Sequence, residues 1–139
     1  MNRVIHFEIH ATDLERAKKF YSDVFGWEMQ QMGAEYGNYV IIKTGPMPNE
    51  TPATMENVGI NGGMMLRNAP VPPHGMGPNA FVCIIGVDNI DAYISKVEAA
   101  GALPQTDKMD VPGVGLLRYY KDPEGNIFGM LQPTPPTAK

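Results

Sequence analysis

Hydrophobic and polar residues alternate strictly at the start of the chain, and the period changes to that of a helix soon after Ala11. Alternation is typical of a strand, whose side chains point in turn to opposite faces. One face would carry Ile5, Phe7 and Ile9, and the other His6, Glu8 and His10. The next residues place apolar side chains at helical spacing, namely Leu14, Ala17, Tyr21, Val24 and Phe25. A helix packed on the apolar face of this strand would leave two imidazoles and a carboxylate on the open face.

The ends of this first helix are expected from capping residues. Thr12 is predicted to be the N-cap, with Glu15 three residues later completing a capping box. Gly26 stands where the glycine that ends a helix is usually found.

The remaining patterns predict seven more strands and a second helix. The strands are expected at 27–32, 37–44, 59–66, 80–87, 102–106, 114–120 and 126–132. Asp88 is expected to cap the second helix, which would end at Gly101, and 109–113 is expected to be a loop. Asp122–Gly125 has the residue pattern of a type I turn.

The second half of the chain repeats the first. When Asp13 is aligned with Asn89, the strands, the helix and its terminal glycine coincide, and near the ends of the two halves Gly63 falls on Gly129. Each half therefore reads as strand, helix and three strands.

This repeat predicts one α+β domain made of two βαβββ modules, at residues 1–66 and 80–139. A linker rich in proline and glycine, 67–79, would join them. The modules would form a cupped, eight-stranded mixed sheet with a helix on the outside of each module, and the open faces would enclose a cavity.

Composition excludes several classes of protein. The chain has 139 residues and a net charge of −4, which argues against nucleic acid as a partner because phosphate binding needs a basic surface. A single cysteine, Cys83, rules out an internal disulfide framework. The chain has no apolar run long enough to span a membrane and no signal-peptide pattern at its start, so a cytoplasmic location is expected.

The candidate site is the polar face of the first strand. His6 and Glu8 are candidates for acid–base chemistry or for a non-standard metal pair, and the alternative is that these groups only bond to one another or to a second subunit. The side chains expected to bind a ligand are His6, Glu8, His10, Tyr39, Asn61 and Tyr119. Met65 and Tyr120 are further candidates to line the cavity, whereas Cys83 is expected to be buried on the helix side.

Three motifs give the chain a family resemblance. They are His6-Phe7-Glu8-Ile9 running into Asp13-Leu14-Glu15, then Phe20-Tyr21 with Phe25-Gly26-Trp27, and finally Asp122-Pro123-Glu124-Gly125-Asn126. With these motifs the chain resembles the vicinal oxygen chelate superfamily, also called the glyoxalase / bleomycin-resistance / extradiol dioxygenase family. The resemblance covers nearly the whole sequence and implies the same paired βαβββ fold and a homodimer.

The resemblance also implies four positions for metal ligands. His6 retains a ligand, whereas Gly63, Val82 and Gly129 stand at the other three positions and cannot coordinate a metal through their side chains. We therefore expect no cofactor, although a divalent metal stays open as an alternative.

Two functions follow from these observations. The first is a binding protein that encloses a small organic ligand in the cup, as bleomycin-resistance-like relatives do, without the usual metal site. The second is a lyase, isomerase or dioxygenase related to lactoylglutathione lyase, which would use His6 and Glu8 as acid and base or as a non-standard metal pair.

Overall fold

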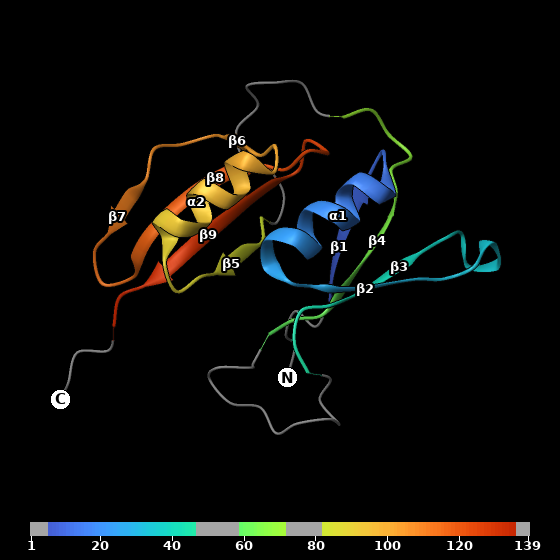
Figure 1. Cartoon of the computed structure of the whole chain (residues 1–139), viewed down its shortest axis with the longest axis horizontal. Coiled ribbons are helices and arrows are strands. Elements are labelled where there is room, and N and C mark those ends of the chain that lie inside the picture. The colour runs from blue at the N-terminus through green and yellow to red at the C-terminus, as the bar shows by residue number, and fades with distance from the viewer. Residues whose placement is uncertain (1–5, 47–58, 72–81, 136–139) are drawn as a thin grey trace. The chain divides into compact units, whose positions relative to one another are not determined.

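The predicted order of one helix and its strands appears in each half of the chain (Figure 1). The computed structural model describes residues 6–46, 59–71 and 82–135. The chain divides into unit 1, Met1–Pro70, and unit 2, Val71–Lys139. Each unit has an α+β arrangement with one mixed sheet and one helix, which confirms the predicted fold class.

In unit 1 the sheet has the strand order β1-β4-β3-β2. β1 (Phe7–Ala11) runs parallel to β4 (Gly62–Leu66), whereas β3 (Val40–Lys43) is antiparallel to both β4 and β2 (Glu28–Gln31). A short 3-10 turn, η1 (Ala34–Tyr36), connects β2 to β3. The parallel pairing of β1 with β4 is possible because α1 (Leu14–Phe25) provides part of the long connection between them.

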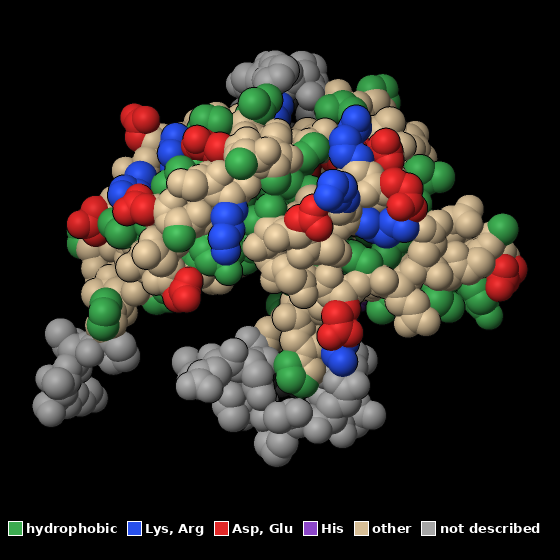
Figure 2. Space-filling view, in the orientation of Figure 1, with side chains coloured by type: hydrophobic (Ala, Val, Ile, Leu, Met, Phe, Trp, Pro, Cys, Tyr) green, Lys and Arg blue, Asp and Glu red, His purple; other side chains and the backbone are tan. Residues whose placement is uncertain are grey.

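The core of unit 1 lies between α1 and one face of this sheet. Five side chains of α1 are buried there, namely Leu14, Ala17, Phe20, Tyr21 and Val24. Val40, Ile42 and Met64 are completely buried and contribute the sheet side of the core. The solvent side of α1 is charged, with ion pairs from Lys18 to Glu15 and from Lys19 to Asp23, and Figure 2 shows acidic and basic side chains intermixed on this face.

In unit 2 the sheet has the strand order β5-β9-β8-β6, and β7 also pairs with β8. The strands are β5 (Ile84–Gly86), β6 (Leu103–Pro104), β7 (Met109–Val111), β8 (Gly115–Lys121) and β9 (Ile127–Pro133). The helix α2 (Ile90–Ala99) packs on this sheet and buries Ile90 and Val97. The tight turn Asp122–Gly125 joins β8 to β9, as predicted, with the Gly125 amide donating to the Asp122 carbonyl oxygen.

The register confirms the internal repeat. Glu8 pairs with Gly63 in unit 1, and Ile84 pairs with Gly129 in unit 2, both in parallel. The two helices also begin at equivalent residues, because the N-caps are Asp13 and Asn89.

The predicted helix caps are wrong by one residue. Asp13, and not Thr12, accepts the capping hydrogen bond from the Arg16 amide, and Asn89, and not Asp88, accepts one from the Ala92 amide. In each pair both residue types are good caps, so the choice depends on where the strand before the helix ends. Gly26 does end α1 in the left-handed conformation, with φ of 71°.

Other boundaries also differ from the prediction. Met109–Val111 is the strand β7 and not a loop, because it pairs with β8 along Leu116 and Leu117. The described residues therefore contain nine strands and not eight. The predicted strands at 59–66 and 80–87 are shorter in the structure, and residues 80 and 81 lie outside the described ranges, as do 72–79 of the predicted linker.

No helix within the described ranges is both long enough and apolar enough to cross a lipid bilayer.

Candidate functional site

Four side chains of unit 1 form one hydrogen-bonded network on the sheet face opposite α1. His6 Nε2 lies 3.0 Å from the Tyr39 hydroxyl oxygen, and this hydroxyl donates to Glu8 Oε2 over 3.3 Å. His10 Nε2 lies 2.8 Å from the other carboxylate oxygen, Glu8 Oε1. The sequence predicts a common face for His6, Glu8 and His10 and names Tyr39 as a further candidate. The structure shows that Tyr39, the residue just before β3, connects His6 to Glu8.

The directions of these hydrogen bonds follow from counting protons. A carboxylate only accepts, so Nε2 of His10 must carry a proton and donate to Glu8. The Tyr39 hydroxyl has one proton, which goes to Glu8, so this oxygen accepts from Nε2 of His6. His6 therefore donates to Tyr39, and both Tyr39 and His10 donate to Glu8, so the carboxylate is the final acceptor of the network.

The position of Tyr39 depends on the glycine beneath it. Gly63 in β4 pairs with Glu8 on one side and with Ile41 on the other, so it lies in the middle of this face. A Cβ atom added at Gly63 would overlap the hydroxyl end of the Tyr39 ring. The phenol can reach Glu8 and His6 because Gly63 leaves this volume empty.

The environment of Tyr39 keeps its hydroxyl protonated. Burial raises the pKa of Tyr39 above its ordinary value, and the negative charge of Glu8 and the hydrogen bond to it raise it further. At neutral pH the phenol is therefore a hydrogen-bond donor and not a base.

We expect this raised pKa to appear in an alkaline titration. Because the pKa of the folded state is above that of the unfolded chain, the contribution of Tyr39 to stability is present below about pH 10 and is lost as the pH rises through the folded-state pKa. The absorbance of tyrosinate should contain a late-titrating component that the Tyr39→Phe variant lacks. An unchanged titration curve in that variant would contradict the assigned contacts.

The structure places the side chain of Asn61 against the backbone at the end of β3. Its side-chain oxygen accepts from the backbone amides of Thr44, at 2.7 Å, and Gly45, at 3.3 Å. These hydrogen bonds connect the residues after β3 to the residue before β4. The predicted contact of Asn61 with a ligand stays a prediction.

Unit 2 has apolar side chains at the equivalent places. Ile84 takes the place of Glu8, and Gly129 takes the place of Gly63. A Cβ atom at Gly129 would meet Ile84 Cδ1 at 2.5 Å and Tyr119 Cε1 at 3.1 Å. Tyr119 therefore lies on the same face of the sheet as Ile84. Its predicted contact with a ligand stays a prediction.

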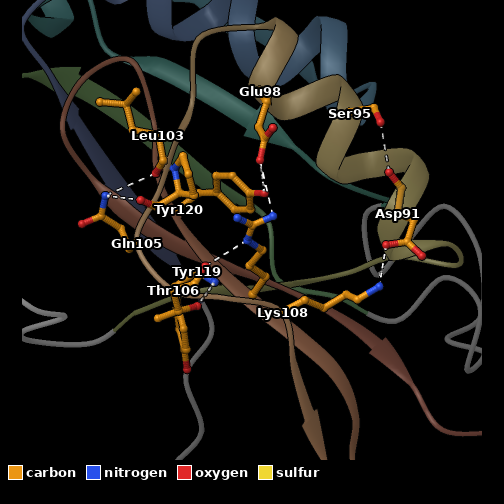
Figure 3. Close-up of polar contacts among 11 residues, drawn as sticks. Asp91, Ser95, Glu98, Leu103, Gln105, Thr106, Lys108, Tyr119 and Tyr120 are labelled. Atoms are coloured by element: carbon orange, nitrogen blue, oxygen red, sulfur yellow. Dashed lines mark hydrogen bonds and ion pairs between the residues drawn. The ribbon is translucent and has the colours of Figure 1, made fainter.

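Tyr120 lies on the opposite face, so its predicted place in the lining of the cavity is wrong. Figure 3 shows its ring directed toward Glu98 of α2, and its hydroxyl donates to Glu98 Oε1 over 2.8 Å. The ring is completely buried, and burial is the main reason that its pKa is raised. Arg118 lies against this ring, 5.1 Å from its centroid, and donates to the Thr106 carbonyl oxygen. Neighbouring tyrosines in a strand point to opposite faces, so only one of the two could belong to the site.

Cys83 is exposed, contrary to the prediction that it is buried on the helix side. The strand β5 starts only at Ile84, so the alternation that placed Cys83 does not extend to it.

The residues present do not fit the metal site that the family resemblance implies. Within the described ranges, no group of three His, Cys, Asp or Glu side chains is arranged to hold a metal ion. Of the four implied positions, only His6 carries a ligand. The space above Gly63 is occupied by Tyr39, and the space above Gly129 by Ile84 and Tyr119.

Comparison with known proteins agrees with the fold and the motifs. Residues 3–45 match the family "Bleomycin resistance protein-like N-terminal". A "Glyoxylase-like domain-containing protein" of Didymella fabae is 31% identical over 127 residues, which cover 88% of this chain and 88% of that protein. The "Putative glyoxylase CFP32" of Mycobacterium tuberculosis is 30% identical over 90% of this chain, but this chain spans only 43% of its length.

Solved structures share the fold at low sequence identity. TnmS3, an antibiotic binding protein from Streptomyces sp. CB03234, is 21% identical with a TM-score of 0.62, covering 96% of this chain and 98% of its own. The fosfomycin resistance protein FosX from Listeria monocytogenes, complexed with Mn(II) and sulfate ion, is 14% identical with a TM-score of 0.68, covering 97% and 93%. The motifs, the repeated modules and the fungal relative, which matches over most of both chains, lead to one conclusion: this chain belongs to the glyoxalase / bleomycin-resistance (vicinal oxygen chelate) superfamily.

Proposed function

We propose that this chain binds a small organic molecule on the polar face of unit 1 and that it does so without a metal ion. The observation that carries the proposal is the network of His6, Glu8, His10 and Tyr39 around Gly63. The phenol of Tyr39 occupies the space that a metal-binding side chain at position 63 would take. Its hydrogen bonds hold the neighbouring polar groups in place. A fixed set of polar groups beside apolar surface is typical of small-molecule sites.

The exposure of these groups supports a ligand and not only internal bonding. The side chains of His10 and Glu8 are 42% and 41% exposed, so both retain surface for a further partner. Ile41, in the same cross-strand row as Glu8 and Gly63, is 43% exposed. The face thus changes from polar to apolar over the width of the sheet, which suits a molecule with one polar end.

Relatives support this type of function but differ among themselves. TnmS3 is described as an antibiotic binding protein, the Didymella fabae relative as glyoxylase-like and the Mycobacterium tuberculosis relative as a putative glyoxylase. The identity of the ligand of this chain therefore has to come from experiment.

An enzymatic function is the second candidate, and the contacts of Glu8 favour it. A carboxylate within hydrogen-bond distance of a phenol and an imidazole has the arrangement that general acid–base catalysis requires. A glyoxalase-type isomerisation of the hemithioacetal of methylglyoxal and glutathione, measured with chelator present and with Glu8→Gln as the comparison, would distinguish an enzyme from a binding protein.

The binding proposal is tested by a fragment screen followed by amide NMR spectra of the labelled protein. We expect bound fragments to shift the amide signals of Glu8, His10, Ile41 and Gly63. The shifts should be the same after treatment with a metal chelator. Signals that move only after a divalent metal is added, or that lie on the α1 side of the sheet, would contradict the proposal.

The homodimer that the resemblance implies stays a prediction, as does the absence of a cofactor.

A further inference from the structure

We propose that the ligand carries a cationic nitrogen, a protonated amine or a guanidinium, and that this group binds against Glu8 and the ring of Tyr39. The inference rests on the proposed function, because it specifies the ligand class of the same face.

The direction of the hydrogen bonds determines what the network offers to a ligand. The proton of Tyr39 and one proton of each histidine are already used within the network. Each oxygen of Glu8 accepts one of these bonds, and an ionised carboxylate has room for about four. The exposed side of the carboxylate can therefore accept further hydrogen bonds, and it carries a negative charge. Both properties favour a positively charged donor.

Within the described ranges, no lysine or arginine forms an ion pair with Glu8. Its contact with His10 is an ion pair only when the imidazole is protonated, and otherwise a neutral hydrogen bond. Arg67 donates through Nη2 to the carbonyl oxygen of His10, at 2.8 Å, and Lys43 stands opposite Glu28 in the β2–β3 pairing. The net charge of −4 also favours the approach of cations over anions.

The side chains beside Glu8 suit the rest of such a molecule. The phenol ring of Tyr39 lies over Gly63, between the strands that carry Glu8 and Ile41. An aromatic face attracts a cation held next to a carboxylate, and the exposed Ile41 side chain offers apolar surface beyond it. A cation attached to an aromatic or aliphatic body would cover both parts of the face.

Three probes of similar size and different charge test this inference: naphthylmethylamine, naphthylmethanol and naphthoate. Each is titrated into the protein at about pH 8, above the ordinary titration range of histidine, with chelator present, and binding is followed by the amide signals of β1, β3 and β4. We expect the amine to bind about tenfold or more tightly than the alcohol, and naphthoate to bind more weakly than either.

Two variants localise the effect. Glu8→Gln keeps the shape of the side chain but removes its charge, so it should abolish the preference for the amine over the alcohol. The matched control is Glu15→Gln, which removes the same charge from the solvent side of α1 and should change neither affinity.

The outcomes separate this inference from the proposed function. If the alcohol or naphthoate shifts the same signals as strongly as the amine does, the face binds ligands and the cationic class is wrong. If the amine is preferred equally by the Glu8→Gln variant, the assignment to Glu8 is wrong. If none of the probes shifts these signals, the inference is overturned, and the fragment screen decides separately whether the proposed function remains.

Discussion

Gly62→Ala should lower the free energy of unfolding by about 3 kcal/mol, the scale of overpacking in a closely packed core. Gly62 is buried on the α1 side of β4 and pairs with Phe7. A Cβ atom there would meet the backbone oxygen of Phe7 at 2.5 Å and the Phe7 ring at 2.7 Å. The backbone oxygen cannot move without separating β1 from β4, and the ring is held against Trp27.

Its neighbour provides the matched control. The three atoms nearest to a Cβ atom at Gly63 all belong to the hydroxyl end of the Tyr39 side chain, which can swing away from the sheet. Gly63→Ala should therefore change the free energy of unfolding by less than about 1 kcal/mol, because the gain from removing a strand glycine offsets the lost contacts. Urea denaturation of the two variants measures the difference. Equal losses in both would contradict the assignment of the two faces of β4.

Asp122→Ala should also destabilise the protein strongly, by about 2–4 kcal/mol, because two backbone amides would lose their hydrogen-bond acceptor. Asp122 is only 3% exposed, and its Oδ1 atom accepts from the amides of Glu124, at 2.9 Å, and Asn126, at 2.8 Å. Removing the carboxylate leaves both amides without this acceptor inside the turn between β8 and β9.

The conservative variant Asp122→Asn tests the mechanism of this loss. Its amide oxygen can still accept both backbone bonds, whereas its NH₂ group would face the side-chain nitrogen of Asn126, which now donates to Oδ2. We expect less than about half of the loss seen with alanine. Denaturation curves of the two variants check this, and an alanine variant as stable as the native protein would show that the turn does not depend on its aspartate. The DPEG motif would then have no structural role in this chain.

The repeat could be read from the sequence because it rests on backbone requirements that each module must meet. The glycines at 63 and 129 fall at equivalent places in both modules, and so do Asp13 and Asn89, although the sequence predicts the caps one residue earlier. The alternation of β1 likewise predicted that His6, Glu8 and His10 share a face. These features depend on local period and spacing, which a sequence carries directly.

The contacts of Tyr39 could not be predicted in the same way. The sequence named Tyr39 as a candidate, but its contact with Glu8 joins residues 31 positions apart and depends on the empty volume above Gly63. Glycine in a strand is typical of a place where another group comes close to the backbone, but it does not show which group. Tyr120 and Cys83 were misplaced for a related reason, since each prediction depended on the exact register or end of a strand.

The polar face of unit 1 is proposed to bind its ligand without a metal ion and through Tyr39, whose position depends on the absence of a side chain at Gly63. Binding of the amine probe to the native protein and to Gly63→Ala, each with and without chelator, tests this claim most directly. We predict that chelator changes neither affinity, that Gly63→Ala binds at least about tenfold more weakly, and that its free energy of unfolding changes by less than about 1 kcal/mol. Loss of binding on chelation, or native affinity in a Gly63→Ala protein whose Tyr39 signals have moved, would contradict the claim.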